Sequence, residues 1–207
     1  MSLLAVIMMA SHNSFGSSAV FTPGEVIVKF RALSEESQAV KEASKTNDLQ
    51  RLSRIVKSLE DRLGLPLIVK QLLSDERILL SINCNELVDQ VNGRLRQSKG
   101  VSEVLMDDSA PHGCRKIPST TFKLDFEPRS VEHQMLMLPT DQKSEQFQNL
   151  ILKLQQVAKV PIEAGSKKEG HLELKIDIAR MTTQLAEHLK TLDTFESVQL
   201  NYVKSFR

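Results

Sequence analysis

One structural pattern occurs twice in the sequence, and this repeat constrains the fold more than any other feature. The alternating segment ILLSIN, which begins at Ile78, returns as LELKID at Leu172, 94 residues later. The helical patterns that follow these segments keep this spacing, because Leu95 and Leu189 are also 94 residues apart. An ordered series at constant spacing indicates two copies of one unit. Two unrelated α+β domains with similar periodicity are the alternative interpretation.

The segments at both ends of each copy extend the repeat. The opening strand pattern VIVKF, from Val26, matches FKLDF, from Phe122, at a spacing of 96. In the closing segments, VSEVLMDD and FESVQLNY, Val104 and Val198 are again 94 residues apart. The segment IVKSLEDRLGLPL also matches LILKLQQVAKVPI, with Pro66 and Pro161 95 residues apart. Five patterns therefore recur in the same order, within two residues of one spacing.

Hydrophobic periodicity assigns a type to each segment. We expect strands near 25–31, 67–73, 77–83 and 101–107 in the first copy, and near 120–127, 160–166, 171–178 and 195–203 in the second. We expect helices near 36–63, broken around Asn47, and near 84–98, 142–158 and 180–192. Asn83 or Asn85 can cap the helix near 84–98. The predicted fold class is α+β, with two tandem ferredoxin-like (βαββαβ) domains that have antiparallel four-stranded sheets.

The start of the chain resembles a secretory signal. An apolar run, LLAVIMMA, precedes a polar stretch in which Ser17 and Ala19 are small residues at the spacing of a cleavage site, although no Lys or Arg precedes the run. We expect cleavage after Ala19 and a secreted or periplasmic protein; an unprocessed N-terminus is the alternative. The predicted organisation is a signal-like segment 1–19, a first domain 20–108, a linker 109–118 rich in Pro and Gly, and a second domain 119–207 with a C-terminal tail.

Composition argues against several partners. The net charge of +1, with no Trp and one Tyr, provides neither a field nor a stacking platform for nucleic acid or an anionic membrane. In an exported chain Cys84 and Cys114 can pair. Cys84 falls on the inward face of a predicted helix, and burial as a small unpaired side chain is the interpretation we favour.

No catalytic motif is present. The sequence lacks a G-x-S-x-G elbow, a phosphate-binding glycine loop, H-E-x-x-H and paired C-x-x-C motifs. The five histidines are scattered, and HGC at His112 to Cys114 offers two ligands where a stable zinc site needs three or four. We therefore expect a protein that is not an enzyme and that has no metal or cofactor.

The opening stretch PGEVIVKF resembles the first strand of the propeptides of subtilisin-like proteases. The same domain occurs alone in the subtilisin propeptide-like inhibitor family. The resemblance covers Pro23 to Asp107 in motif and element order, and extends more loosely to the second copy. It implies a ferredoxin-like fold and a secreted inhibitor, or intermolecular chaperone, of a subtilisin-like serine protease.

The resemblance also implies which residues bind. In the family the open sheet face packs on two helices of the protease, and carboxylates at the end of the last strand meet the N-termini of those helices. Asp107 matches one such position in the first copy, whereas its partner position holds Leu105. In the second copy the matching residues are Gln199 and Asn201, which accept hydrogen bonds but carry no charge.

The family's inhibitory element is the tail after the last strand, which lies extended in the substrate groove. The corresponding residues here are Tyr202, Val203, Lys204, Ser205, Phe206 and Arg207. By the family's spacing Arg207 occupies the primary specificity pocket, and this hints at a protease that accepts basic residues. With no protease domain after Arg207, we expect a free-standing protein if the chain is complete.

Two other functions stay open. A non-inhibitory pair of ferredoxin-like domains could bind another protein through its sheet faces, since domains of this fold serve many roles. A regulatory pair that binds a small molecule would need a polar pocket between the two copies, and no motif for one is present. An inhibitor needs residues 203–207 extended and free, whereas a scaffold does not.

Overall fold

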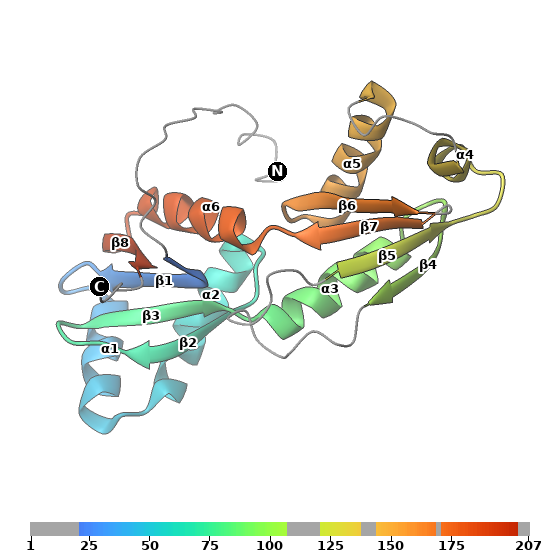
Figure 1. Ribbon diagram of the computed structural model, residues 1–207. Helices are drawn as coiled ribbons and strands as arrows, with labels where there is room; N and C mark the ends of the chain where they lie inside the picture. Colours follow the sequence, from blue (N-terminus) through green and yellow to red (C-terminus); the bar gives the residue numbers. More distant parts are fainter. Residues whose placement is uncertain (1–20, 107–120, 138–143, 169–170, 203–207) are drawn as a thin grey trace, which may run out of the picture. The chain divides into compact units, whose positions relative to one another are not determined.

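The computed structural model describes residues 21–106, 121–137, 144–168 and 171–202. Within these ranges the chain is mixed α+β, with six α-helices and two four-stranded antiparallel sheets (Figure 1). This architecture is compatible with the two ferredoxin-like units expected from the sequence. The predicted signal segment and the linker lie outside the described residues.

Sheet A has the strand order β2-β3-β1-β8. Its strands are β1 (Phe21–Phe30), β2 (Leu67–Leu72), β3 (Arg77–Ile82) and β8 (Phe195–Tyr202). Its helices are α1 (Glu35–Thr46), the 3-10 helix η2 (Leu49–Leu52), α2 (Ser53–Leu63) and α6 (Ile178–Lys190). The break expected around Asn47 is confirmed: Asn47 ends α1 in the left-handed conformation, with φ 53°.

Sheet B has the strand order β4-β5-β7-β6. Its strands are β4 (Val101–Met106), β5 (Thr121–Phe126), β6 (Ile162–Lys168) and β7 (His171–Ile176). Its helices are α3 (Cys84–Arg96), α4 (Val131–Met137) and α5 (Glu145–Ala158). The short helix α4 is not expected from the periodicity.

The last helix and strand of each copy are exchanged between the two sheets. Strand β8 pairs with β1, and β4 pairs with β5 (Figure 1). The described chain accordingly divides into unit A, with residues 21–88 and 178–202, and unit B, with residues 89–106 and 121–177 apart from the undescribed gaps. The boundary falls within α3, so residues 84–88 at its start are counted with unit A. These units differ from the predicted domains 20–108 and 119–207, because each combines segments from both.

Equivalent hydrogen bonds occur in the two units. In unit A the N–H of Arg31 donates to the carbonyl oxygen of Thr194, at 3.0 Å. In unit B the N–H of Glu127 donates to the carbonyl oxygen of Gly100, at 2.8 Å. The spacing of the repeat relates both donors and both acceptors, so the exchange joins matching positions of the two copies.

The length of two connections explains the exchange. Only Asn83 links β3 to α3, and only Asp177 links β7 to α6. A helix that folds back onto the sheet of its preceding strand usually needs a connection of about 2–6 residues. With a single residue, the helix leaves its own sheet. Asn83, rather than Asn85, caps α3, because its Oδ1 accepts a hydrogen bond from the N–H of Glu86.

The predicted state of Cys84 is wrong. Its side chain is buried, as expected, but it is disulfide-bonded rather than a free thiol. Cys114, the only other cysteine of the chain, lies outside the described residues. Helical periodicity placed Cys84 on an inward face, and that placement cannot distinguish a buried thiol from a buried disulfide.

Matching helix ends carry different residues and yield a prediction. Gly64 ends α2 and Lys159 ends α5, both left-handed, with φ 68° and 59°. Because glycine adopts this conformation without a Cβ penalty, Lys159→Gly should stabilise unit B by about 0.5–1 kcal/mol. Gly64→Lys should destabilise unit A by a similar amount, although a Cβ there meets no neighbour. Urea unfolding of both variants tests this, and a loss of stability in Lys159→Gly would contradict it.

Candidate interaction face of sheet A

Among the described residues, helices pack on one face of sheet A and none packs on the other. On β1, Val26, Val28 and Phe30 point into the core and are at most 2% exposed. Strand geometry directs the alternate residues Glu25 and Ile27 to the opposite face. Because α6 and α2 lie against the core side, this opposite face is the candidate interaction face.

An apolar row lies at the centre of the candidate interaction face. It consists of Ile27 of β1 and Leu79 of β3, which lie opposite each other, and Leu79 in turn lies opposite Gln71 of β2. Ile68 of β2 lies opposite Ser81, in the row of Glu25, and adds an apolar side chain beside the apolar row. Ile68 is 44% exposed, Ile27 is half-buried and Leu79 is buried. On the other side of Ile27 lies Gln199 of β8, which is exposed.

A buried carboxylate organises the neighbouring row. Glu25 is 1% exposed and forms an ion pair with Lys70 of β2. The amide Nδ2 of Asn201 donates a hydrogen bond to its other oxygen, at 2.6 Å. A buried carboxylate needs such partners to offset its desolvation. Glu25 of β1 therefore links β1 to β2 and β8. Because the Nδ2 of Asn201 donates to Glu25, the amide oxygen of Asn201, Oδ1, is directed away from that carboxylate.

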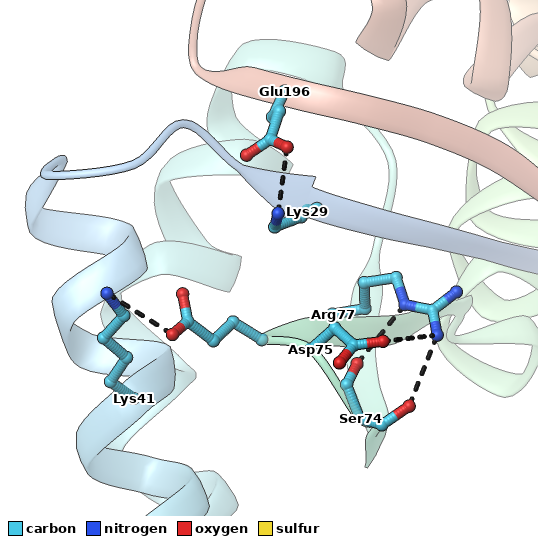
Figure 2. A network of polar contacts seen from close by, with 7 residues as sticks. Lys29, Lys41, Ser74, Asp75, Arg77 and Glu196 are labelled. Carbon is cyan, nitrogen blue, oxygen red and sulfur yellow. Dashed lines mark hydrogen bonds and ion pairs between the residues drawn. The ribbon is translucent and has the colours of Figure 1, made fainter.

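Polar contacts surround the far end of the face (Figure 2). Lys29 of β1 donates to Glu196 of β8 at 2.9 Å, and the hydrogen bond to this carboxylate raises the pKa of Lys29. Arg77 of β3 contacts Ser74 and Asp75 in the β2–β3 turn. The apolar row therefore lies between the row that holds Lys29 and Arg77 and the row that holds Glu25.

The opening motif is held by the C-terminal helix. Gly24, with φ 84°, sits where the pairing of β1 and β8 changes register. Its N–H donates to the Oγ1 of Thr182 at 2.6 Å, and that hydroxyl donates to the carbonyl oxygen of Ile178 at 2.5 Å. The glycine of the stretch FTPGE therefore receives its hydrogen-bond acceptor from α6.

Replacing Thr182 with valine should show how much the hydrogen bond between Gly24 and Thr182 contributes to the stability of unit A. Thr182 is fully buried, so Thr182→Val leaves the N–H of Gly24 without an acceptor and should destabilise unit A by about 1–3 kcal/mol. Thr183→Val is the matched control, because Thr183 makes the same bond to a helix carbonyl in an exposed position. Urea unfolding of both variants is the measurement, and equal stabilities would contradict the assignment.

The corresponding face of sheet B is charged. The repeat places Lys123 at the position of Ile27, and Lys123 is exposed. Its neighbours on the same face include Glu173 and Lys175 of β7, and Asp125 contacts His171 across the strands. This composition is that of a solvated sheet face, so an apolar row of the kind found on sheet A is absent from the described part of β5 and β7.

The expected binding residues are only partly within the described chain. Gln199 and Asn201 both lie on β8 of unit A, and Tyr202 is 54% exposed at its end. Asp107 and the tail residues 203–207 lie outside the described residues. Glu25 is not among the binding residues expected from the sequence, although a single Glu in an apolar opening strand is a visible signal.

The described part of the chain holds no candidate metal centre. None of its His, Cys, Asp and Glu residues form a group of three or more that could hold a metal ion. Burial, with a smaller contribution from Arg62, lowers the pKa of His188. A groove of about 610 Å³ runs between α2 and β2, with Leu49, Val56 and Ile68 among its lining residues.

Comparison with known proteins adds no family assignment: no protein-family model, curated protein sequence or solved structure matches this chain. Over the described ranges, no helix has the length and apolar character needed to cross a membrane.

Proposed function

We propose that the chain is a secreted inhibitor or folding chaperone of a subtilisin-like serine protease, built from two ferredoxin-like units that exchange their last helix and strand. Unit A docks through the candidate interaction face, and the tail after Tyr202 enters the substrate groove. The observation that carries this proposal is the pairing of β1 with β8. It joins the propeptide-like opening strand to the strand that leads into the tail.

The exchange supports a single inhibitory unit. In two contiguous domains the opening strand would pair with β4, and β4 leads into the linker rather than into residues 203–207. Pairing with β8 instead gives unit A the opening strand, the open face and the C-terminal segment together. Unit B then serves as a scaffold or a second binding surface.

The chemistry of the face favours docking by unit A. Its apolar row provides area that releases water on binding, and such central apolar contacts dominate interface energy. Asn201 adds a hydrogen-bond acceptor, Oδ1, that Glu25 holds in place. A helix N-terminus of the protease presents free N–H groups that such an acceptor satisfies.

The disulfide bond of Cys84 supports export. Disulfides persist in secreted and periplasmic proteins and are rare in a reducing cytosol. This agrees with the signal-like start of the sequence, and the processing of that segment is part of the proposal.

A non-inhibitory interaction scaffold is the second candidate. Exposed Tyr202 and the apolar row would suit a partner protein that has no substrate groove. The two functions differ in one requirement, because only the inhibitor needs residues 203–207 free to enter a groove.

Titration against a panel of subtilisin-like and trypsin-like proteases, with peptide hydrolysis as the readout, tests the proposal. The full chain should inhibit stoichiometrically, and deletion of residues 203–207 should abolish inhibition. Ile27→Lys should weaken inhibition by about 10- to 100-fold, as for loss of a central contact. Lys123→Ile, the reverse change on sheet B, should leave it unchanged. No inhibition by the intact chain, in a panel that includes proteases of its own source, would favour the scaffold.

A further inference from the structure

The arm formed by α6 and β8, residues 178–202, is recognised by specific contacts in sheet A. Thr182 accepts from Gly24, Asn201 donates to Glu25, and Glu196 pairs with Lys29. These partners are 158 to 176 residues apart in the chain. Sequence proximity therefore does not enforce these contacts, and side-chain complementarity specifies them.

The equivalent arm of the first copy lacks these groups. The repeat places Val88 at the position of Thr182, Ser102 at that of Glu196 and Asp107 at that of Asn201. Valine cannot accept a hydrogen bond from Gly24. An aspartate beside buried Glu25 would set two carboxylates against each other, which is unfavourable in a position shielded from water. Sheet A therefore selects the arm 178–202 over the arm 84–106.

Aromatic packing adds to this selection. The rings of Phe30 and Phe195 lie 5.0 Å apart, centre to centre, in a tilted arrangement. The repeat places Val101 at the position of Phe195. A valine there would leave part of the space beside Phe30 unfilled, and such a cavity is costly in a packed core.

The one-residue connection at Asp177 does not determine whether the arm on sheet A comes from the same chain or from a second copy. Asp177 alone links β7 to α6, and its N–H is bonded to Pro161 within unit B. All the contacts described above lie inside unit A. An arm from a second copy would reproduce each of them, and only the path of the chain at Asp177 would change.

We infer that the partner suited to the arm-binding side of sheet A is a second copy of this chain, which inserts its own residues 178–202 to form a closed, arm-exchanged dimer. The arm 178–202 fits sheet A and not sheet B. Two copies can therefore each bind the arm of the other, and the resulting dimer leaves no arm-binding side vacant. This inference does not depend on the proposed protease inhibition.

Concentration during folding decides between the monomer and the dimer. A short connection gives the chain's own arm an effective concentration in the range of about 1 mM. Refolding at about 10 µM should give almost only monomer, and refolding near 1 mM should give comparable amounts of monomer and dimer. The dimer should persist after dilution, because release of an arm requires opening of sheet A.

A cysteine pair across the arm junction tests the inference in the full chain. Ile27 and Gln199 lie directly opposite on the candidate interaction face, at a separation that suits a disulfide. In Ile27→Cys/Gln199→Cys, the added disulfide should lie within one chain in the monomer and between two chains in the dimer. Denaturing gels without reductant, with peptide mass mapping to separate it from the Cys84 disulfide, distinguish the two.

The pair Ile68→Cys/Ser81→Cys is the control, because both residues belong to the same part of the chain. Its disulfide should stay within one chain in monomer and dimer alike. Two results would overturn the inference: only monomer at every refolding concentration, or a dimer in which the added disulfide between positions 27 and 199 remains within each chain.

Discussion

Deletion of residues 178–207 is expected to unfold unit A and to leave unit B folded. The deletion removes β8, which pairs along β1, and α6, which covers the core side of β1. The core residues Val26 and Val28 would then lose their cover, and the N–H of Gly24 would lose its acceptor. An open three-stranded sheet with half its helical layer missing cannot retain enough buried area to offset the entropy of folding.

Hydrogen exchange followed by mass spectrometry measures this outcome segment by segment. Amides of β3 should lose protection, whereas those of β7 should retain it. Deletion of residues 203–207 alone is the control and should leave both strands protected. Two contiguous domains would give the opposite pattern, with β3 protected and β7 exposed, and that result would contradict the exchange.

Phe195→Ala should destabilise unit A by about 3–5 kcal/mol, the usual cost of removing a buried phenylalanine side chain. The ring of Phe195 is 6% exposed and contacts Phe30 of β1. The substitution lies near the end of the chain, yet its main effect should fall on β1 and β3. The cavity opens beside Phe30, and β1 and β8 cannot close it without breaking their pairing.

Phe126→Ala is the matched control for this prediction. Phe126 is 4% exposed in β5 and occupies the position of Phe30 in the repeat, so a similar loss falls on unit B. Hydrogen exchange in urea should show β3 opening first in Phe195→Ala and β7 opening first in Phe126→Ala. If β7 opened before β3 in Phe195→Ala, Phe195 would belong to unit B, which would contradict the exchanged fold.

The sequence was sufficient to predict the elements but not the partner of each closing strand. Periodicity predicted all eight strands, and β5 and β7 bury alternate residues as the pattern requires. It could not assign β8 to β1, since Val104 and Val198 present the same apolar side chain to either sheet. The pairing of β8 with β1 depends on the one-residue connection at Asp177 and on polar pairs such as Glu25 and Asn201. Such a pair cannot be recognised in the sequence, because its two residues lie far apart along the chain.

The candidate site was predictable to a similar extent. Gln199 and Asn201 were identified from the family resemblance, and both lie on an edge strand of sheet A. The role of Asn201 as a donor to Glu25 could not be predicted, because it depends on which strand lies beside β1. The role of Thr182 as the acceptor for Gly24 could not be predicted either, because the sequence shows only one polar residue on a helix.

A comparison of two engineered disulfides tests the exchange most directly. The repeat relates Gln199 of β8 to Leu105 of β4, so contiguous domains would place Leu105 opposite Ile27, where the structure has Gln199. At micromolar concentration, Ile27→Cys/Gln199→Cys should form a disulfide within the monomer, and Ile27→Cys/Leu105→Cys should not. A disulfide between positions 27 and 105, with none between 27 and 199, would contradict the exchanged fold and, with it, the joining of the opening strand to the tail in one unit.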